Sequence, residues 1–298
     1  MRIQTRIQMR IRQVFSSASL AAVLMSTAQA ACLSDAQVVA LHDAYSARQP
    51  AVNPEGLSAA DGECTRTKFN RMLATQMGAV VGYKAGLTNP AVQKRFNHDS
   101  PVWGTLYEAM LLKDGAVVEA AFGARPLFEA DLLVRVSSAA INQAQTPAEV
   151  MAAIDQVIPF IELPDLVVQA PARLNGAAIS AINVGARLGV MGAPIPVPPT
   201  RAERFALLDA LRDMVAVVSE GGVEVDRGKG SDVLEHPLNA VVWLAKDMAR
   251  SGDGAAMKPG DLISLGSFSK LLPPRPGLAV DVTYWGLPGR PVVRVSFR

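Results

Sequence analysis

The order in which helical and β-rich segments follow one another is the feature that most constrains this fold. Residues 34–47 and 63–77 carry apolar side chains at helical spacing, and short β-rich runs predominate from residue 78 onward. Strands are predicted at 80–86, 116–118, 132–136, 157–163, 261–267, 278–285 and 292–297. Further helices are predicted at 146–157, in the first part of 201–218 and at 237–251. Because strands and helices do not alternate regularly, the pattern predicts an α+β protein rather than a repeated βαβ architecture.

Residues 1–30 have the three parts of a secretory signal peptide. The positive region contains Arg2, Arg6, Arg10 and Arg12 and no acidic residue. A short apolar run at 14–25 and the sequence Ala-Gln-Ala at 28–30 follow it. The apolar run is too short to span a bilayer. An arginine-rich amphipathic leader or a misassigned start codon is the alternative interpretation. Export would place the mature protein in the periplasm or outside the cell.

The net charge depends on this leader. The whole chain carries +2, and removal of the four leader arginines leaves about −2. No basic stripe remains that would indicate nucleic-acid binding, and no membrane association is expected after cleavage. A lipoprotein anchored through Cys32 is a weaker alternative, because Gln29 stands where such signals have leucine.

The two cysteines, Cys32 and Cys64, are predicted to form a disulfide. Both lie in the mature chain, and an isolated pair in an oxidising compartment tends to be bonded. In the chain-entropy model, closure of this loop contributes roughly 3–4 kcal/mol. Two unrelated buried thiols are the alternative.

Several common catalytic arrangements lack their parts. The three histidines, His42, His98 and His236, lie far apart and not at ligand spacing. No G-x-S-x-G elbow occurs, and the sequence at 228–231 lacks the upstream glycine of a phosphate loop. Serine or cysteine hydrolase chemistry and nucleotide binding through a P-loop are therefore not expected.

Three carboxylates carry the strongest chemical signal. Glu129 and Asp131 open an apolar strand and, at spacing i and i+2, project from the same face. Glu162 lies inside another apolar run, where a carboxylate is costly unless it is paired or bound to a metal. A hard divalent cation would relieve repulsion among the three. Ordinary solvated strand positions are the alternative.

Several ordered segments resemble the 2-keto-4-pentenoate hydratase family of the fumarylacetoacetate hydrolase superfamily. The sequence GYKAGLT at 82–88 resembles that family's GYKIGLT, and the triplet at 129–131 resembles its E-P-E pair. Glu162 follows Glu129 by 33 residues, as the family's third ligand does. The segments at 233–245 and 265–269 resemble its NPLNAVAWLA helix and AGSFT strand end. The similarity runs from about residue 33 to the C-terminus.

The resemblance implies a specific fold and site. The two predicted helices and the disulfide already indicate a small helical N-terminal cap at 31–77, and the resemblance implies that it lies on a catalytic β-rich mixed-sheet roll at 78–298, of the fumarylacetoacetate hydrolase C-terminal type. The resemblance also implies Mg²⁺ or Mn²⁺ held by the three carboxylates and chelated by a short 2-oxo acid. Lys84 would stabilise charge or move a proton, and Asn183 and Ser267 would bind the substrate. A homo-oligomer is expected on the same grounds.

The sequence departs from the family pattern at positions that bear on proton transfer. Val102 and Ile182 stand where the family has aspartates, and neither side chain can exchange a proton. Asp131 replaces a glutamate and reaches about one methylene less far. A lyase or hydratase acting on a 2-hydroxypenta-2,4-dienoate-like acid is the first hypothesis. A related decarboxylase, tautomerase or acylpyruvate hydrolase, or a non-catalytic periplasmic binding protein for a 2-oxo acid or dicarboxylate, is the alternative. The third hypothesis is an exported structural domain that binds neither metal nor ligand.

Overall fold

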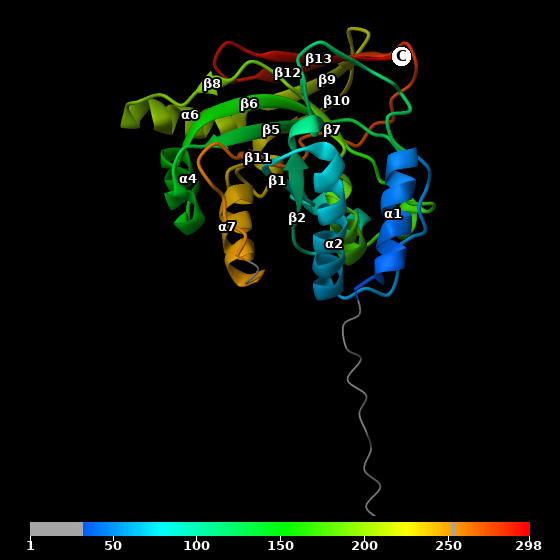
Figure 1. Ribbon diagram of the computed structural model, residues 1–298. Coiled ribbons are helices and arrows are strands. Elements are labelled where there is room, and N and C mark those ends of the chain that lie inside the picture. The colour runs from blue at the N-terminus through cyan, green and yellow to red at the C-terminus, as the bar shows by residue number, and fades with distance from the viewer. Residues whose placement is uncertain (1–31, 252–253) are drawn as a thin grey trace, which may run out of the picture.

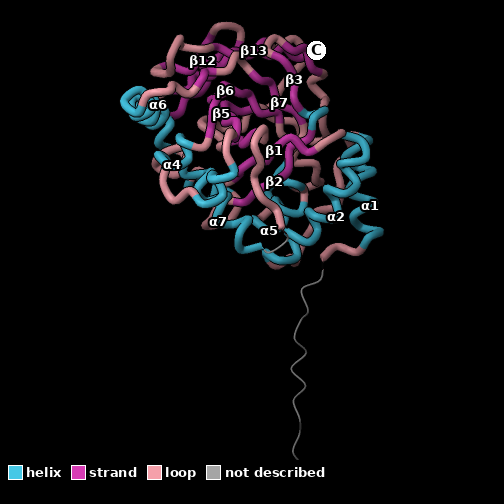
Figure 2. Tube along the Cα trace, turned by 60° about the vertical axis from the view of Figure 1, so that its left-hand side comes forward, coloured by secondary structure: helices cyan, strands magenta, loops and turns pink. Residues whose placement is uncertain are grey.

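The computed structural model of the protein describes residues 32–251 and 254–298 (Figure 1). The predicted leader at 1–30 lies outside this part of the chain. Two sheets and their covering helices make up the molecule, with the strands gathered in one half and α1, α2, α5 and α7 along the other (Figure 2). This arrangement confirms the α+β class. No helix in the described part of the chain is both long enough and apolar enough to cross a membrane.

The larger sheet has eight strands in the order β2-β1-β11-β5-β6-β7-β3, with β8 paired to β6. Its strands are β1 (Val80–Gly86), β2 (Val102–Tyr107), β3 (Leu111–Lys113), β5 (Glu129–Val136), β6 (Ile154–Leu163), β7 (Leu188–Met191), β8 (Ile195–Pro196) and β11 (Leu262–Ser264). The β1–β11 and β3–β7 pairs are parallel and the others antiparallel, so the sheet is mixed. Strand β2 is one edge of this sheet.

The second sheet has five strands in the order β10-β9-β12-β13-β4. They are β4 (Ala116–Val118), β9 (Val215–Glu220), β10 (Val223–Lys229), β12 (Ala279–Trp285) and β13 (Val292–Phe297). The buried Tyr284 of β12 links the two sheets, because its hydroxyl oxygen lies 2.7 Å from the Asp131 carbonyl oxygen and accepts the Phe160 N–H at 3.1 Å. Burial of this hydroxyl raises the pKa of Tyr284 well above its ordinary value.

Seven α-helices and five 3₁₀ turns are found in the described residues. The α-helices are α1 (Asp35–Ala47), α2 (Ala59–Met77), α3 (Pro90–Arg95), α4 (Pro147–Ala152), α5 (Gly176–Ala181), α6 (Arg201–Asp213) and α7 (Asn239–Ser251). The 3₁₀ turns are η1 (Glu108–Met110), η2 (Ala139–Gln143), η3 (Pro171–Arg173), η4 (Asn183–Gly185) and η5 (Gly230–Asp232). One apolar core lies between the two sheets and a second lies between the larger sheet and the group α1, α2 and α5.

The helix boundaries follow their local caps, with two differences from the sequence pattern. At the start of α1, Ser34 and Gln37 form a capping box. Helix α2 begins four residues earlier than expected, because Ser58 and Asp61 form a second capping box. The helix expected over 146–157 ends at Ala152, because the chain from Ile154 onward pairs with β5. Tertiary pairing here overrides local helix propensity.

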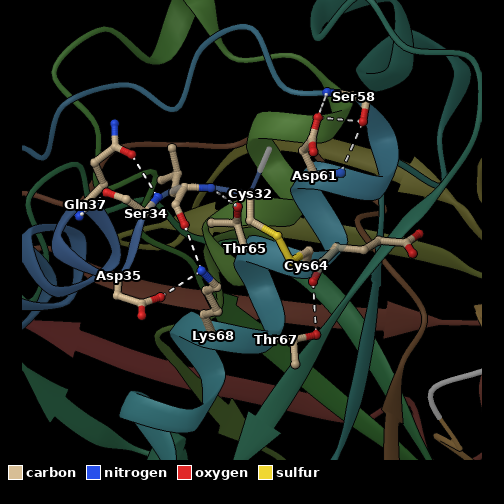
Figure 3. The surroundings of a disulfide bond; sticks show 12 residues. Cys32, Ser34, Asp35, Gln37, Ser58, Asp61, Cys64, Thr65, Thr67 and Lys68 are labelled. Atoms are coloured by element: carbon tan, nitrogen blue, oxygen red, sulfur yellow. Dashed lines mark hydrogen bonds and ion pairs between the residues drawn. A yellow bond between two sulfur atoms is a disulfide. The ribbon is translucent and has the colours of Figure 1, made fainter. Parts of the chain in front are cut away.

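The predicted disulfide joins Cys32 to Cys64, whose Cα atoms lie 5.7 Å apart (Figure 3). Cys64 lies in the first part of α2, and the N-terminal segment is held there by further polar contacts. The Leu33 N–H donates to the Thr65 hydroxyl at 3.1 Å, and the Lys68 ammonium donates to Asp35 at 2.7 Å. The bond therefore fastens the start of the described chain to α2.

Candidate active site

A small cavity of about 50 Å³ lies where β1, β5 and β6 meet the loop that follows β1. Its charged lining residues are Lys84, Glu129 and Glu162. The large apolar residues of its lining, called the apolar wall below, are Leu87, Val92, Phe96, Leu166, Ile179 and Leu271. The cavity thus combines three charged groups with a mostly apolar lining, which is the usual composition of a small-molecule site.

Glu129 and Glu162 face each other in this cavity. Glu129 is the first residue of β5, and the antiparallel register places it directly opposite Glu162 near the end of β6. Only 7% of Glu129 and 3% of Glu162 are exposed. Directly opposed strand residues have Cβ atoms about 4.5–5.5 Å apart, so the two carboxylates are held close together inside the protein.

Lys84 is the cation of the site. It lies on β1, and its ammonium donates to Glu162 Oε1 and, at 3.0 Å, to the carbonyl oxygen of Val184. Both members of the Lys84–Glu162 pair are buried. The structure therefore brings the predicted catalytic lysine to the predicted metal-binding carboxylates.

Asp131 is next to this group but is held differently. It is fully buried and accepts hydrogen bonds from the Ser264 hydroxyl and from the Leu265 and Gly266 amides at 3.2 and 3.0 Å. Its own strand contributes the Leu132 amide at 2.6 Å. Asp131 does not line the cavity. Its carboxylate is thus held by hydrogen bonds from the end of β11 and from the residues that follow it.

Burial and mutual repulsion raise two pKa values at the site. Desolvation raises the pKa of Glu129 well above its ordinary value, and the charge of Glu162 raises it further, against a smaller lowering by Lys84. Desolvation and the charge of Glu162 raise the pKa of Asp131 in the same way. Burial and the nearby charge of Glu162 thus disfavour the ionised forms of Glu129 and Asp131.

The residues at the cavity suit a hard divalent cation. Carboxylate oxygens are the preferred donors of Mg²⁺ and Mn²⁺. Glu162 Oε2 is buried and has no hydrogen-bond partner among the described residues, so an oxygen is available beside Glu129. The acidic, histidine and cysteine side chains in residues 32–251 and 254–298 do not form a group of three at metal-binding geometry. Glu129 and Glu162 are therefore the pair that faces the cavity, and Asp131 as a third ligand stays a prediction.

The two predicted substrate-binding residues lie in different environments. Ser267 lines the cavity beside Glu129, and its hydroxyl donates to the Ser269 carbonyl at 2.5 Å. Asn183 is fully buried and does not line the cavity. Its side chain bonds instead to the backbone of Thr105. The structure therefore gives Asn183 a backbone partner where sequence reasoning expected a substrate contact.

Two contacts at the site were not predicted from the sequence. The hydroxyl of Ser264 binds Asp131, and the carbonyl of Val184 binds Lys84. Val102 and Ile182, which stand in place of the family aspartates, are both buried and do not line the cavity. These relationships depend on contacts between segments far apart in the chain.

The structure is similar to solved structures of two metal-bound enzymes. The 4-oxalocrotonate decarboxylase from Pseudomonas putida G7, complexed with magnesium and adipate, has a TM-score of 0.74 and 25% sequence identity. That match covers 89% of this chain and 99% of the decarboxylase. The fumarylpyruvate hydrolase from Pseudomonas aeruginosa, complexed with Mn²⁺ and pyruvate, has a TM-score of 0.51 at 14% identity and covers 72% of this chain and 89% of the hydrolase. The fold is that of the fumarylacetoacetate hydrolase superfamily.

Sequence comparison identifies the family within that class. The 2-keto-4-pentenoate hydratase of Paraburkholderia xenovorans (strain LB400) is 30% identical over 218 residues, which is 73% of this chain and 76% of the relative. The chain belongs to the 2-keto-4-pentenoate hydratase family. No family model matches the sequence.

Proposed function

We propose that the protein is a divalent-metal-dependent hydro-lyase that acts on a short 2-oxo acid or its 2-hydroxydienoate form. The observation that carries this proposal is the opposed, buried pair of Glu129 and Glu162 with Lys84 beside it, in a chain of the hydratase family. The cavity residues lie between Lys84 and Leu271, which supports the assignment of residues 78–298 as the catalytic part.

The residues of the chain divide the work of such a site. Glu129 and Glu162 would hold Mg²⁺ or Mn²⁺. When bound, the cation supplies Lewis-acid stabilisation of an enolate. Lys84 has three ammonium hydrogens, of which two have partners in Glu162 and Val184. The third is available to an anionic substrate or a water molecule, so Lys84 can stabilise negative charge or move a proton there. The apolar wall limits the entry of bulk water.

The apolar wall also favours a substrate with a single carboxylate. Lys84 is the one cationic residue among the described lining residues, and Glu162 is already its partner. A second carboxylate on the substrate would find no further cation among the lining residues and would be desolvated without a counter-charge. We therefore favour a neutral tail, as in 2-hydroxypenta-2,4-dienoate, over a dicarboxylic acid.

The direct test is turnover of 2-hydroxypenta-2,4-dienoate, followed by the loss of its absorbance. We expect loss that requires Mg²⁺ or Mn²⁺ and stops when EDTA removes the cation. Glu129→Gln should abolish it, while Glu119→Gln, which removes an exposed carboxylate that does not line the cavity, should not. Turnover that is unchanged by EDTA or by Glu129→Gln would contradict the proposal.

A non-catalytic binding protein for a 2-oxo acid is the second candidate. The apolar side chains of Val102 and Ile182 favour it, because they stand where the family has acidic residues. This candidate predicts metal-dependent thermal stabilisation by oxalate or pyruvate with no turnover of the dienoate or of related 2-oxo acids. Turnover with wild-type protein excludes it.

We also propose that the protein is exported and acts in the periplasm or outside the cell. The three-part leader pattern and the Cys32–Cys64 bond support this, since disulfides persist in oxidising compartments. N-terminal sequencing of protein from the native host should begin at or near Ala31. Retention of Met1 would contradict export.

A further inference from the structure

Asn183 makes a two-way contact with the backbone of one residue. The Thr105 N–H donates to Asn183 Oδ1 at 2.7 Å, and Asn183 Nδ2 donates to the Thr105 carbonyl at 2.9 Å. Thr105 lies on β2, the edge strand of the larger sheet. The amide thus occupies the position of a neighbouring strand and satisfies two backbone groups that an edge strand leaves open.

The backbone approaches β2 very closely at this point. A Cβ atom on Gly104 would lie 2.6 Å from the Asn183 carbonyl oxygen, so only glycine is accommodated there. In the β1–β2 pair, Gly104 is the register partner of Lys84. The segment that carries Asn183 is therefore fastened to Thr105, which follows the register partner of Lys84 on β2.

Asn183 and Val184 both have left-handed backbone conformations. Their φ angles are each 54°, which is unfavourable for the β-branched Val184. Gly86 makes room for Val184, since a Cβ atom on Gly86 would lie 2.4 Å from Val184 Cγ1. Such a conformation persists only where surrounding contacts hold it. Its consequence is that the Val184 carbonyl faces Lys84 at 3.0 Å.

We propose that Asn183 is a positioning residue for Lys84. Its amide holds η4 on the edge of β2, keeps Val184 in the left-handed conformation and so directs the Val184 carbonyl at the Lys84 ammonium. With Glu162 on its other side, the ammonium is then fixed at the wall of the cavity. The effect on catalysis rests on the proposed function, whereas the geometric effect on Lys84 does not.

The test is Asn183→Asp. This substitution keeps the shape of the side chain and the oxygen that accepts the Thr105 N–H, but it replaces the donating NH₂ group with an oxygen, which repels the Thr105 carbonyl oxygen. The chain contains two matched controls, because two other asparagines make the same two-way contact with a backbone. Asn142 bonds to Met257 at 2.8 and 2.9 Å, and Asn53 bonds to Ala170 at 2.8 and 2.9 Å. Neither lines the cavity.

We expect Asn183→Asp to lower kcat by about tenfold or more, because small displacements of a catalytic group are costly. KM and the dissociation constant for Mn²⁺ should change by less than about threefold, since the cavity carboxylates are not altered. Asn142→Asp and Asn53→Asp should retain kcat even where they lower the melting temperature. A crystal structure of Asn183→Asp should show the Lys84 ammonium displaced from the Val184 carbonyl.

A second variant keeps the proposal testable if Asn183→Asp does not fold. Asn183→Asp combined with Val184→Gly removes the unfavourable φ at the next residue, because glycine adopts positive φ freely. This double variant should fold and should still have a lowered kcat, because its carbonyl is no longer held. Wild-type kcat in either variant, or an unmoved Lys84 ammonium in its crystal structure, would overturn the proposal. Absence of turnover in the wild type would count against the proposed function, and the position of Lys84 would still decide the inference.

Discussion

Glu129 and Glu162 are direct neighbours across the β5–β6 pair, and of the two it is Glu162 that binds the ammonium of Lys84. The two carboxylates are therefore unequal, although both are buried at one cavity. Glu162 has a counter-charge, whereas Glu129 has a raised pKa that arises from burial and from the charge of Glu162. In the metal-free protein, we therefore expect removal of the two carboxylates to have different effects on the free energy of unfolding.

The first prediction concerns stability without metal. Glu162→Gln removes the partner of a buried lysine and should lower the free energy of unfolding by about 3 kcal/mol or more. Glu129→Gln removes a carboxyl group whose ionised form is disfavoured by burial and by Glu162, and it should leave the free energy of unfolding unchanged or raise it. Urea unfolding in the presence of EDTA measures both. Equal destabilisation by the two substitutions would show that the lysine does not distinguish the carboxylates.

The second prediction concerns the disulfide. Reduction, or the Cys32→Ser/Cys64→Ser double substitution, should lower the free energy of unfolding by about 2–4 kcal/mol. Thermal unfolding with and without reductant measures the effect, and the double variant, which has no bond to break, serves as the control. Mass spectrometry of the non-reduced protein should find a Cys32–Cys64 peptide. Free thiols at both positions would contradict the assignment.

The third prediction concerns pH and His236. Burial lowers the pKa of His236, whose ring accepts the Leu238 N–H at Nδ1 and lies 3.1 Å from the Leu208 carbonyl at Nε2. The folded state therefore prefers neutral histidine, while the unfolded state takes up a proton near pH 6.5. Stability should fall as the pH decreases below about 6.5 and should continue to fall down to the lowered pKa. Urea unfolding from pH 8 to 5 should show this slope, and His236→Gln should remove its histidine-dependent part; an identical slope in that variant would contradict the assignment.

The fourth prediction concerns the tail of the substrate. Wild-type protein with Mn²⁺ should bind 2-oxohexanoate more tightly than 2-oxohexanedioate, because the cavity wall offers no second cation. Val92→Lys places one on α3 at the wall and should shift the ratio of the two dissociation constants by about tenfold toward the dicarboxylate, equivalent to about 1.4 kcal/mol. Ala91→Lys, at an exposed position on the same helix and outside this cavity, is the control. Tighter binding of the dicarboxylate by wild type would contradict the neutral-tail assignment.

Local signals in the sequence predicted much of the framework. The period of two predicted that Glu129 and Asp131 project from one face of a strand, and the helical spacing of apolar residues predicted the helix that forms as α1. The cysteine pair was predicted from its isolation in a chain expected to be exported, and the structure confirms the bond. These features depend on a few neighbouring residues or on a simple count.

The remaining features depend on contacts between distant segments. Lys84 and Glu162 are 78 residues apart, and Asn183 and Thr105 are also 78 residues apart, so their pairing follows from strand order rather than from local pattern. The end of α4 at Ala152 also depends on a distant segment, because the residues from Ile154 onward pair with β5. Sequence reasoning identified Asn183 as a residue of interest but could not give its partner.

The central claim is that Glu129 and Glu162 hold a divalent cation that in turn binds a 2-oxo acid. Calorimetric titration of pyruvate into wild-type protein, with Mn²⁺ and with EDTA, tests it most directly. We expect pyruvate binding only with Mn²⁺ and, by linkage, tighter Mn²⁺ binding by the same factor when pyruvate is present. Glu129→Gln and Glu162→Gln should each abolish both effects. Pyruvate binding of equal strength with EDTA, or Mn²⁺ binding unchanged in the two variants, would contradict the account.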